Sequence, residues 1–439
     1  MRKFSMFNIK NIYEKKSWQL VIYCWLAYMT VYIGRKNLSV CLADMINDGV
    51  TDSVSGGVIG TGFMLCYAIG QFINGWVGDH VHPRFMICIG LMGAGLMNIL
   101  MGLNSVNILF LVIWVMCGFF CSMLWSPILR AVSIWTTNEI SQLAGTSLTA
   151  TIPIGTICCY LICALGLRLG NWRISFMICG TVLVIMAAIL SFCFGTLKDH
   201  MISETVSRSE MKSGTSDTVS PVKIRIFCAG LVFAACGILF NGMLKDGLDL
   251  WIPTVLCEKF IPSSSVVSLI CTLLPLVNIF GAYAARYVFQ HFQLDELSTC
   301  GVMFAISTVS LAIVTIFLYV SPVKEMGAVI GLADIVLVIL ITLLLAVCSA
   351  SMLGANTMLL TFIPLHFGKI GRAATITGML NCISYAAAAV SSIAIGYISE
   401  TFDWAAVFAI FSGAALAGTV ICFSGRRSLK QKMDEIDTL

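Results

Sequence analysis

Long apolar segments recur along almost the whole chain of 439 residues. A helix needs roughly 20 mostly apolar residues to cross a bilayer, and it must pair its own backbone polar groups there. Only 11% of the residues are charged, against about a quarter in soluble domains. The chain is therefore predicted to be an all-α integral membrane protein. Its twelve predicted transmembrane helices cover residues 18–43, 56–78, 84–104, 107–134, 143–168, 173–196, 225–250, 264–290, 297–320, 333–363, 373–398 and 404–424.

Basic residues are distributed unevenly between the two predicted sides of the membrane. With the N-terminus inside, 19 of the 26 Lys and Arg residues lie near cytoplasmic helix ends and four near outer ends. This bias predicts a multi-pass protein of the cell (inner) membrane with both termini cytoplasmic. The first apolar run is too long for a signal-peptide core, so we expect it to be retained as a helix. The remaining three basic residues, Arg35, Lys36 and Lys245, lie within apolar segments.

One long polar stretch divides the chain. Residues 197–224 are rich in Ser and Thr with mixed charge, which is typical of a flexible linker, here cytoplasmic. The predicted domains are an N-terminal six-helix bundle (1–196), this linker (197–224) and a C-terminal six-helix bundle (225–439). In both halves a Trp precedes a helix rich in small residues, in GNWRISF and FDWAAVF. Weak internal repeats of this kind favour two pseudo-symmetric bundles.

Arg35 and Lys36 stand side by side in the first apolar segment. A basic residue at the centre of a membrane helix costs about 2.5–3.5 kcal/mol on insertion scales, so its presence calls for a reason. One interpretation is that both side chains extend toward the outer headgroups. The other is that Arg35 lines a central pathway. Adjacent residues point roughly 100° apart on a helix, so Lys36 is expected to pair elsewhere or to extend to the headgroups.

Lys245 lies in the segment LFNGMLKDGLDLWIP near the end of the seventh predicted helix. Asp249 is four residues further on, so the two side chains share a helix face and could form a self-neutralised ion pair. Alternatively, Lys245 is a second cation, equivalent to Arg35 in the other half. Two fixed positive charges in a cavity of low dielectric constant suit a multiply charged anion, and a phosphoryl group is the obvious candidate.

Aromatic and amide side chains accompany these cations. Tyr28 and Tyr32 precede Arg35 by seven and three positions, which predicts that all three share one helix face. Tyr67 and Gln71 are four apart, and Trp125 lies in SMLWSPILR. Each of these residues alone is explained by packing. Together they predict a pocket with aromatic walls and with hydroxyl and amide donors.

The segment NGWVGDHVHPR between the second and third helices carries Asp79 and Arg84. An acid at a helix C-terminus is unfavourable because of the helix dipole, and a basic partner would offset that. Arg130, at the inner end of the fourth helix, is a candidate partner. We therefore interpret Asp79, Arg84 and Arg130 as a conformational latch on the cytoplasmic side.

The nineteen cysteines are scattered and include no CxxC pair. Neither they nor the five histidines form a ligand-spaced group in the sequence, so we expect no metal and no cofactor. No nucleophile–base arrangement is evident either, so we expect no enzymatic activity. Nothing in the sequence indicates a nucleic-acid partner.

Several segments resemble the major facilitator superfamily and, within it, the organophosphate:phosphate antiporters, which transport glycerol 3-phosphate, hexose phosphates and glucose 6-phosphate. The segments that carry the resemblance are YMTVYIGRKNLSV, YAIGQFINGWVGDHVHPR, SMLWSPILR, KDGLDLWIP and GYISETFDW. It implies rocker-switch transport of a phosphorylated metabolite in exchange for inorganic phosphate, by a monomer in the lipid bilayer. By the same resemblance Arg35 matches the arginine that binds the substrate phosphate, and Lys245 matches a second essential arginine. Cavity-lining aromatic positions are matched by Tyr28, Tyr32, Tyr67 and Trp125.

The chain also departs from that family's pattern. Lys245 keeps the charge of an arginine but lacks its bidentate fork. Gln71 stands where bacterial glycerol-3-phosphate transporters have a lysine, and Ile152 lies where they have a histidine. Ala285 occupies the position of an acid in the second-half motif. Two alternatives therefore stay open: transport of a non-phosphorylated organic anion, and a sugar-phosphate sensor of the hexose-phosphate receptor type.

Overall fold

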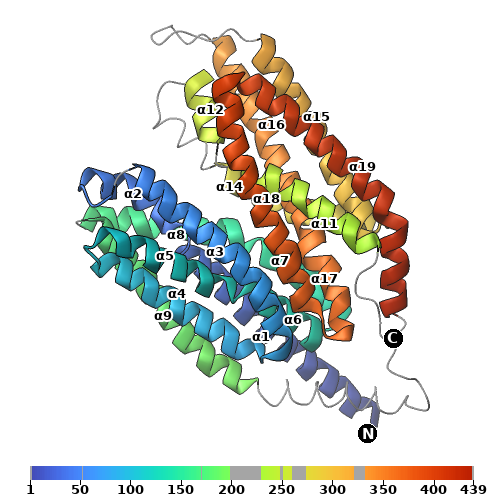
Figure 1. Cartoon of the computed structure of the whole chain (residues 1–439). Helices are drawn as coiled ribbons and strands as arrows, with labels where there is room; N and C mark the ends of the chain where they lie inside the picture. Colours follow the sequence, from blue (N-terminus) through green and yellow to red (C-terminus); the bar gives the residue numbers. More distant parts are fainter. Residues whose placement is uncertain are drawn as a thin grey trace. The chain divides into compact units, whose positions relative to one another are not determined.

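The computed structural model describes residues 2–51, 53–169, 171–197, 229–247, 251–259, 273–320 and 332–437. Within these ranges the chain forms helices joined by short connections and contains no strand, which confirms the predicted all-α class (Figure 1). The chain divides into two compact units. The first unit is Met1–Cys228 with Pro364–Met379 and Glu435–Leu439, and the second is Ala229–Ile363 with Leu380–Asp434.

The first unit is built mainly from the N-terminal helices. They are α1 (Arg2–Ile33), α2 (Asn37–Asn47), α3 (Ser53–His80), α4 (Pro83–Leu103), α5 (Asn107–Ser122), α6 (Trp125–Trp135), α7 (Asn138–Thr149), α8 (Thr151–Leu169) and α9 (Trp172–Thr196). The 3₁₀ turn η3 (Phe367–Ile370) and the first residues of α18 (Ala373–Thr401) also belong to this unit.

The second unit contains most of the C-terminal helices. They are α11 (Ala229–Gly242), the π-helical turn η1 (Met243–Gly247), α12 (Ile252–Lys259), α14 (Leu273–His291), α15 (Glu296–Val320), α16 (Leu332–Thr357) and the π-helical turn η2 (Met358–Phe362). After η2 comes the short α17 (Ile363–His366), at the boundary of the units, and later in the chain the rest of α18 and α19 (Trp404–Asp437).

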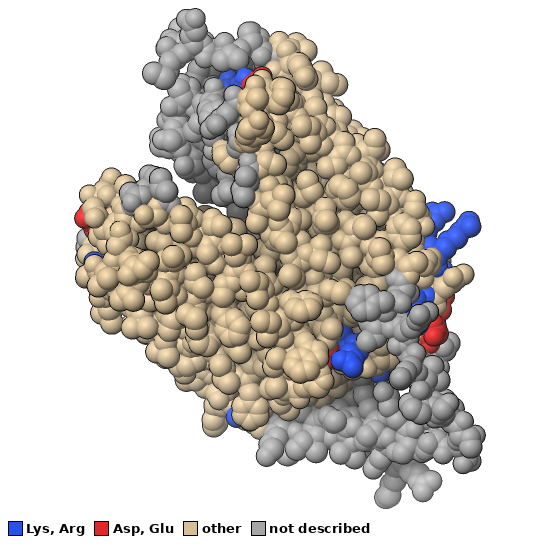
Figure 2. Space-filling view, in the orientation of Figure 1, with Lys and Arg blue, Asp and Glu red and all other residues tan. Residues whose placement is uncertain are grey.

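Ten segments within the described ranges are long and apolar enough to cross a membrane. Two predicted spans are not among them: residues 18–43 fall on α1 and α2, and residues 264–290 are described only from Leu273 onward. Figure 2 shows one face of the molecule, in the orientation of Figure 1. The described surface of that face is almost free of charged side chains, which collect near its edges. An uncharged face of this kind suits contact with lipid. The predicted linker, apart from Leu197, lies outside the described residues.

The prediction of one continuous helix over residues 18–43 is wrong. Helix α1 ends at Ile33, α2 begins at Asn37, and Gly34, Arg35 and Lys36 form a turn between them. Hydropathy could not reveal this break, because it reports the composition of a segment and not its backbone hydrogen bonds. We refer to residues 34–36 as the helix break.

Two further predicted helices are also interrupted, and in both cases a proline explains the position. Helix α5 ends before Met123, and Pro127 has no N–H to bond the carbonyl of Met123 four residues earlier. Pro153 has the same relation to Thr149, where α7 ends. The predicted helix over 225–250 instead turns π-helical at Met243.

Helices α4 and α9 run side by side in the first unit and approach each other closely (Figure 1). A Cβ added to Gly95 would lie 2.9 Å from the carbonyl oxygen of Gly180, and one added to Gly180 would lie 2.6 Å from that of Gly95. Facing glycines let membrane helices pack backbone to backbone. This packing fixes the position of Asn98, which is one turn along α4 from Gly95 and is fully buried.

Candidate functional site

Arg35 lies in the helix break and not on a regular helix face. The backbone N–H groups of Arg35 and Lys36 both donate to the carbonyl of Tyr32, over 3.4 and 3.3 Å. These are long bonds for a helical turn. Both basic side chains are half-buried. Arg35 therefore extends from an irregular turn and not from a regular helix. It still lies beside Tyr32, as predicted.

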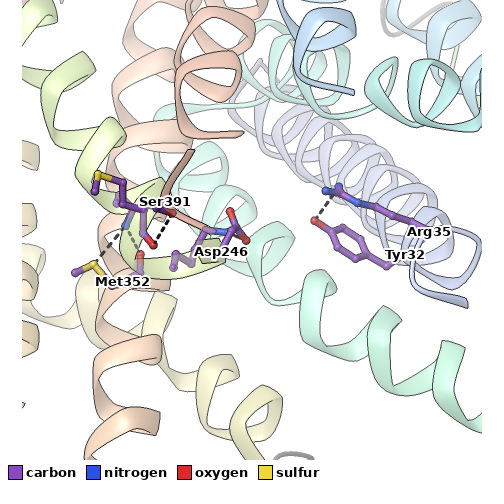
Figure 3. A network of polar contacts seen from close by, with 8 residues as sticks. Tyr32, Arg35, Asp246, Met352 and Ser391 are labelled. Carbon is purple, nitrogen blue, oxygen red and sulfur yellow. Dashed lines mark hydrogen bonds and ion pairs between the residues drawn. The ribbon is translucent and has the colours of Figure 1, made fainter. Parts of the chain in front are cut away.

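Aromatic rings surround the guanidinium of Arg35. Its Cζ lies 4.2 Å from the ring centre of Tyr67, 5.0 Å from that of Tyr32 and 5.9 Å from that of Phe63. Nη1 also donates to the Tyr32 hydroxyl over 3.4 Å, and Figure 3 shows the two groups pointing toward each other. Ring faces attract a cation with about 0.5–2 kcal/mol each, depending on desolvation. The rings therefore stabilise this charge.

The ring contacts continue from Tyr32 to Trp125. The Tyr28 and Tyr32 rings meet edge to face with centres 5.4 Å apart. Tyr28 also packs against Trp125 with ring centres 4.5 Å apart. Three predicted aromatic residues from two helices, α1 and α6, thus form one wall beside Arg35.

Polar contacts connect Tyr67, whose ring packs on Arg35, with helix α6, which also carries Trp125. Gln71 Nε2 donates to the Tyr67 hydroxyl over 2.7 Å, as their spacing of four residues predicts. Gln71 Oε1 in turn accepts a hydrogen bond from Ser126 over 3.3 Å. Because Ser126 is adjacent to Trp125, the contacts close into a ring. The structure therefore brings together six of the seven predicted binding residues, which are Arg35, Tyr28, Tyr32, Tyr67, Gln71 and Trp125.

The indole of Trp125 has an unused hydrogen-bonding group. Its Nε1 is buried and has no hydrogen-bond partner among the described residues. An indole N–H is only a donor, and leaving such a donor unpaired when buried costs about 1–3 kcal/mol. An oxygen atom of a bound anion would satisfy it. The site thus combines a cation, several donors and apolar ring faces.

Lys245 lies in the π-helical turn η1 of the second unit. Its Nζ is 2.6 Å from Oδ1 of Asp246, and the two side chains are 14% and 32% exposed. The alternative pairing with Asp249 concerns a residue outside the described ranges. Isolated π-helical turns are frequent at functional sites. Both predicted cations therefore lie where a helix is irregular, and the acid beside Lys245 is its direct neighbour in sequence.

Polar side chains flank the turn that carries Lys245, as Figure 3 shows. Asn241 Nδ2 donates to the carbonyl of Met352 over 2.7 Å, which ties α11 to α16. Ser391 Oγ, from α18, lies 3.5 Å from the carbonyl of Met243 at the start of η1. The irregular turn is thus anchored on both neighbouring helices.

Asp79 forms a helix cap with the first turn of α18 in the first unit. Its carboxylate accepts hydrogen bonds from the N–H groups of Ala374 and Thr375, over 3.0 and 2.9 Å, and from the Thr375 hydroxyl. A carboxylate is favourable at a helix N-terminus. The acid that is poorly placed at the end of α3 is thus well placed at the start of α18.

The predicted basic residues near Asp79 bind backbone carbonyls. Arg130 Nη1 donates to the carbonyls of Gly78 and Val81, over 2.6 and 2.7 Å, and so caps the C-terminus of α3. Arg84 Nη2 donates to the carbonyl of Ser191 on α9 over 2.8 Å. Asp79 and Arg130 thus each cap a helix end, Asp79 the start of α18 and Arg130 the end of α3.

Three cysteines that do not form a ligand-spaced group in the sequence converge in the first unit. The sulfur atoms of Cys159, Cys163 and Cys179 lie within 4.8 Å of one another, and all three side chains are buried. Cys159 and Cys163 are four apart on α8, with sulfurs 3.9 Å apart. The sequence could not reveal the group, because Cys179 comes from α9. Thiols at this separation pack as small apolar groups.

Sequence reasoning also missed residues of the site around Arg35. Phe63 precedes Tyr67 by four residues, so helical periodicity could have placed it on the same face. Ser126 follows Trp125 directly, but its hydrogen bond to Gln71 could be identified only from the structure. Asn98 contacts the helix break, but no pattern in the sequence around it indicates this contact.

Comparison with known proteins places these observations in a family. The family model described as Major Facilitator Superfamily matches residues 24–389. A probable hexose phosphate transport protein of Chlamydia trachomatis is 27% identical over 179 residues, 40% of this chain and 39% of the relative. The membrane sensor protein UhpC of Escherichia coli is 28% identical over 184 residues, 39% of each chain. The chain thus spans about two fifths of the length of these two relatives.

A longer alignment links the chain to a plant protein. The putative glycerol-3-phosphate transporter 1 of Arabidopsis thaliana is 23% identical over 414 residues, which cover 85% of this chain and 75% of the relative. The family model, by contrast, covers well over half of the chain on its own. The chain is a multi-pass membrane protein, and it belongs to the Major Facilitator Superfamily.

Proposed function

We propose that this protein is a secondary active transporter of a phosphorylated small metabolite, of the sugar phosphate or glycerol phosphate type. It exchanges this substrate for inorganic phosphate by rocker-switch alternating access. The observation that carries the proposal is the cationic, aromatic-walled site around Arg35, with the buried unpaired donor of Trp125. The similarity to a probable hexose phosphate transport protein and to a putative glycerol-3-phosphate transporter supports the same substrate class.

The chemistry of the site matches a phosphate ester. A guanidinium stacks on a ring by its face and still donates hydrogen bonds within its plane, which suits two phosphoryl oxygens at once. The Trp125 N–H supplies a further donor. The ring faces of Tyr28 and Tyr32 and the amide of Gln71 suit the organic part of the substrate. Transport and not catalysis is the proposed activity.

We assign Lys245 the role of a second substrate cation. Its ammonium is a point charge that Asp246 now neutralises over 2.6 Å. A bound anion has to compete with this carboxylate for the ammonium group. Asp246 therefore limits the affinity of Lys245 for the anion. Substitutions of Lys245 and Asp246 test this assignment separately from the site around Arg35.

The remaining features of the transporter follow as parts of the same proposal. The chain is a monomer with both termini cytoplasmic, and bundles at 1–196 and 225–439 are joined by the linker at 197–224. Asp79, Arg84 and Arg130 act in gating. Release of the Asp79 carboxylate from Ala374 and Thr375 frees the first turn of α18 and is the gating step we propose.

A sensor is the second candidate function, because the similarity to the membrane sensor protein UhpC covers 39% of each chain. A sensor binds its ligand at such a site and transports it poorly. Binding without exchange therefore separates it from a transporter.

A binding screen on the purified full-length protein tests the substrate class. Thermal stability is measured with inorganic phosphate, glucose 6-phosphate, glycerol 3-phosphate and a non-phosphorylated dicarboxylate, in wild type, Arg35→Ala and Lys245→Ala. We expect a phosphate ester to raise the melting temperature of wild type and of neither variant. Stabilisation by the dicarboxylate alone would point to the non-phosphorylated anion. Equal stabilisation of all three proteins would show that neither Arg35 nor Lys245 contributes to binding of the ligand.

A further inference from the structure

Two side chains from other helices contact the Gly34 carbonyl in the helix break that carries Arg35: Asn98 of α4 and, at 4.0 Å, the Sγ of Cys117 of α5. Asn98 of α4 donates from Nδ2 to the carbonyl of Gly34 over 2.9 Å, and also to the carbonyl of Ala94 over 2.9 Å. Its Oδ1 accepts a hydrogen bond from Asn37 Nδ2 over 2.6 Å. Gly34 directly precedes Arg35, and Asn37 is the first residue of α2. One amide therefore contacts the chain on both sides of Arg35 and Lys36.

The break creates the need for such a contact. Where a helix is interrupted, a carbonyl loses its N–H partner four residues later, and leaving it buried and unpaired costs about 1–3 kcal/mol. Gly34 is buried, and Asn98 and Asn37 are 0% exposed. The Asn98 amide, at 2.9 Å, is the shorter of the two side-chain contacts of the Gly34 carbonyl, since the Cys117 Sγ lies at 4.0 Å.

Gly34 is matched to this contact. A Cβ at residue 34 would lie 2.9 Å from Asn98 Nδ2 and 2.8 Å from Leu183 Cδ2, closer than real Cβ atoms come. Any other residue at this position would push the amide away. Gly34 and Asn98 are thus matched to each other. Helix α4, which carries Asn98, is held in place by its close packing on α9.

We propose that Asn98 is a positioning residue for the substrate site: it fixes the break between α1 and α2 and thereby holds the Arg35 guanidinium over Tyr67. The substrate part of this inference rests on the proposed function, whereas the structural part does not. The second unit offers a parallel, since Ser391 contacts the carbonyl of Met243 at the start of the irregular turn that carries Lys245.

The test uses the full-length protein and the variants Asn98→Ala and Asn74→Ala. Asn74 is a matched control, because it is buried and donates a comparable hydrogen bond to Ser122, over 2.7 Å, in the same unit. Two measurements need no substrate: hydrogen–deuterium exchange over residues 34–38, and the rate at which phenylglyoxal modifies Arg35, followed by mass spectrometry. We expect both to rise in Asn98→Ala and neither to change in Asn74→Ala.

The third measurement is the affinity for glucose 6-phosphate, in a double-mutant cycle with Arg35→Ala. Asn98→Ala should weaken binding about tenfold in the wild-type background and add no further loss once Arg35 is removed. An equal loss in both backgrounds would overturn the inference, because Asn98 would then act without Arg35. Unchanged exchange and unchanged Arg35 modification would overturn it as well.

Two further outcomes are covered by the same design. If Asn98→Ala does not fold, Asn37→Ala replaces it: this variant removes the bond to Asn98 Oδ1 but keeps the bond from Asn98 to the Gly34 carbonyl, and it should shift the three measurements in the same direction by less. If wild type binds no phosphate ester, the proposed function fails. Exchange and Arg35 modification then still decide whether Asn98 positions the arginine.

Discussion

The guanidinium carbon of Arg35 lies 4.2 Å from the centre of the Tyr67 ring. The electron-rich face of the ring attracts the cation and stabilises it. The contact thus helps to explain how a basic residue is kept within an apolar segment.

The first prediction concerns the ring of Tyr67. Tyr67→Leu removes the ring face and should weaken glucose 6-phosphate binding by about 0.5–2 kcal/mol. Tyr67→Phe keeps the ring face and loses the hydroxyl that accepts from Gln71, so its affinity should stay closer to wild type. Phe63→Leu serves as the control, because that ring is 5.9 Å from Arg35 and should matter less. Equal losses in Tyr67→Leu and Tyr67→Phe, measured by isothermal titration, would contradict the cation–π account.

The second prediction separates stability from binding at Trp125. Trp125→Phe keeps a ring and removes the buried unpaired N–H, so the melting temperature of the free protein should not fall. Substrate affinity should fall about tenfold, because a donor to the phosphate is lost. Trp135, whose Nε1 is also buried without a partner among the described residues, provides the control. Trp135→Phe should leave affinity unchanged, and a loss of affinity in both variants would speak against a specific role of Trp125.

The third prediction orders three proteins by their affinity for inorganic phosphate. Asp246→Asn removes the carboxylate that pairs with Lys245, so phosphate should bind more tightly than in wild type at low salt. Lys245→Ala should bind it more weakly. Equilibrium binding of labelled phosphate gives the order directly. If Asp246→Asn binds more weakly than wild type, the carboxylate does not compete with the anion.

How much of this site the sequence predicts depends on the kind of contact. The contact of Gln71 with Tyr67 and the neighbourhood of Tyr28, Tyr32 and Arg35 follow from helical periodicity, because these contacts are local. The helix break is different: it depends on a hydrogen bond from Asn98, which is more than sixty residues away. A hydropathy pattern carries no information on such a bond.

The same distinction explains the cytoplasmic motif. The sequence indicates that Asp79 needs a positive partner and suggests a side chain. The structure shows that Asp79 also accepts from the backbone N–H groups of Ala374 and Thr375, on a helix almost three hundred residues later. A helix N-terminus is a source of positive potential that no basic residue marks in a sequence. Tertiary contacts of this kind could not be predicted from composition or spacing.

The fourth prediction concerns pH and His82, between α3 and α4. Its Nδ1 accepts a hydrogen bond from the N–H of Arg84 over 3.3 Å and so caps α4. Burial lowers the pKa of His82, and the positive charges of Arg130 and Arg84 lower it further. The folded protein therefore binds this proton less readily than the unfolded chain, whose histidines titrate near pH ~6.5.

The sign of the effect follows from that difference. Stability from neutral His82 is fully present above the unfolded pKa and is lost as the pH falls through it toward the lower folded value. Melting temperatures between about pH 7.5 and pH 5 should thus decline more steeply for wild type than for His82→Asn, in which an uncharged cap remains. Identical slopes would show that His82 does not contribute to the pH dependence.

In the proposed transport cycle, Arg35 binds the phosphoryl group that the protein exchanges. Proteoliposomes loaded with inorganic phosphate test it by uptake of labelled glucose 6-phosphate and glycerol 3-phosphate, with Lys36→Ala as the matched control for removing a basic residue from the helix break. We expect phosphate-dependent uptake of at least one ester by wild type and Lys36→Ala, and none by Arg35→Ala. Uptake that Arg35→Ala retains, or no uptake of either ester by wild type, would contradict it.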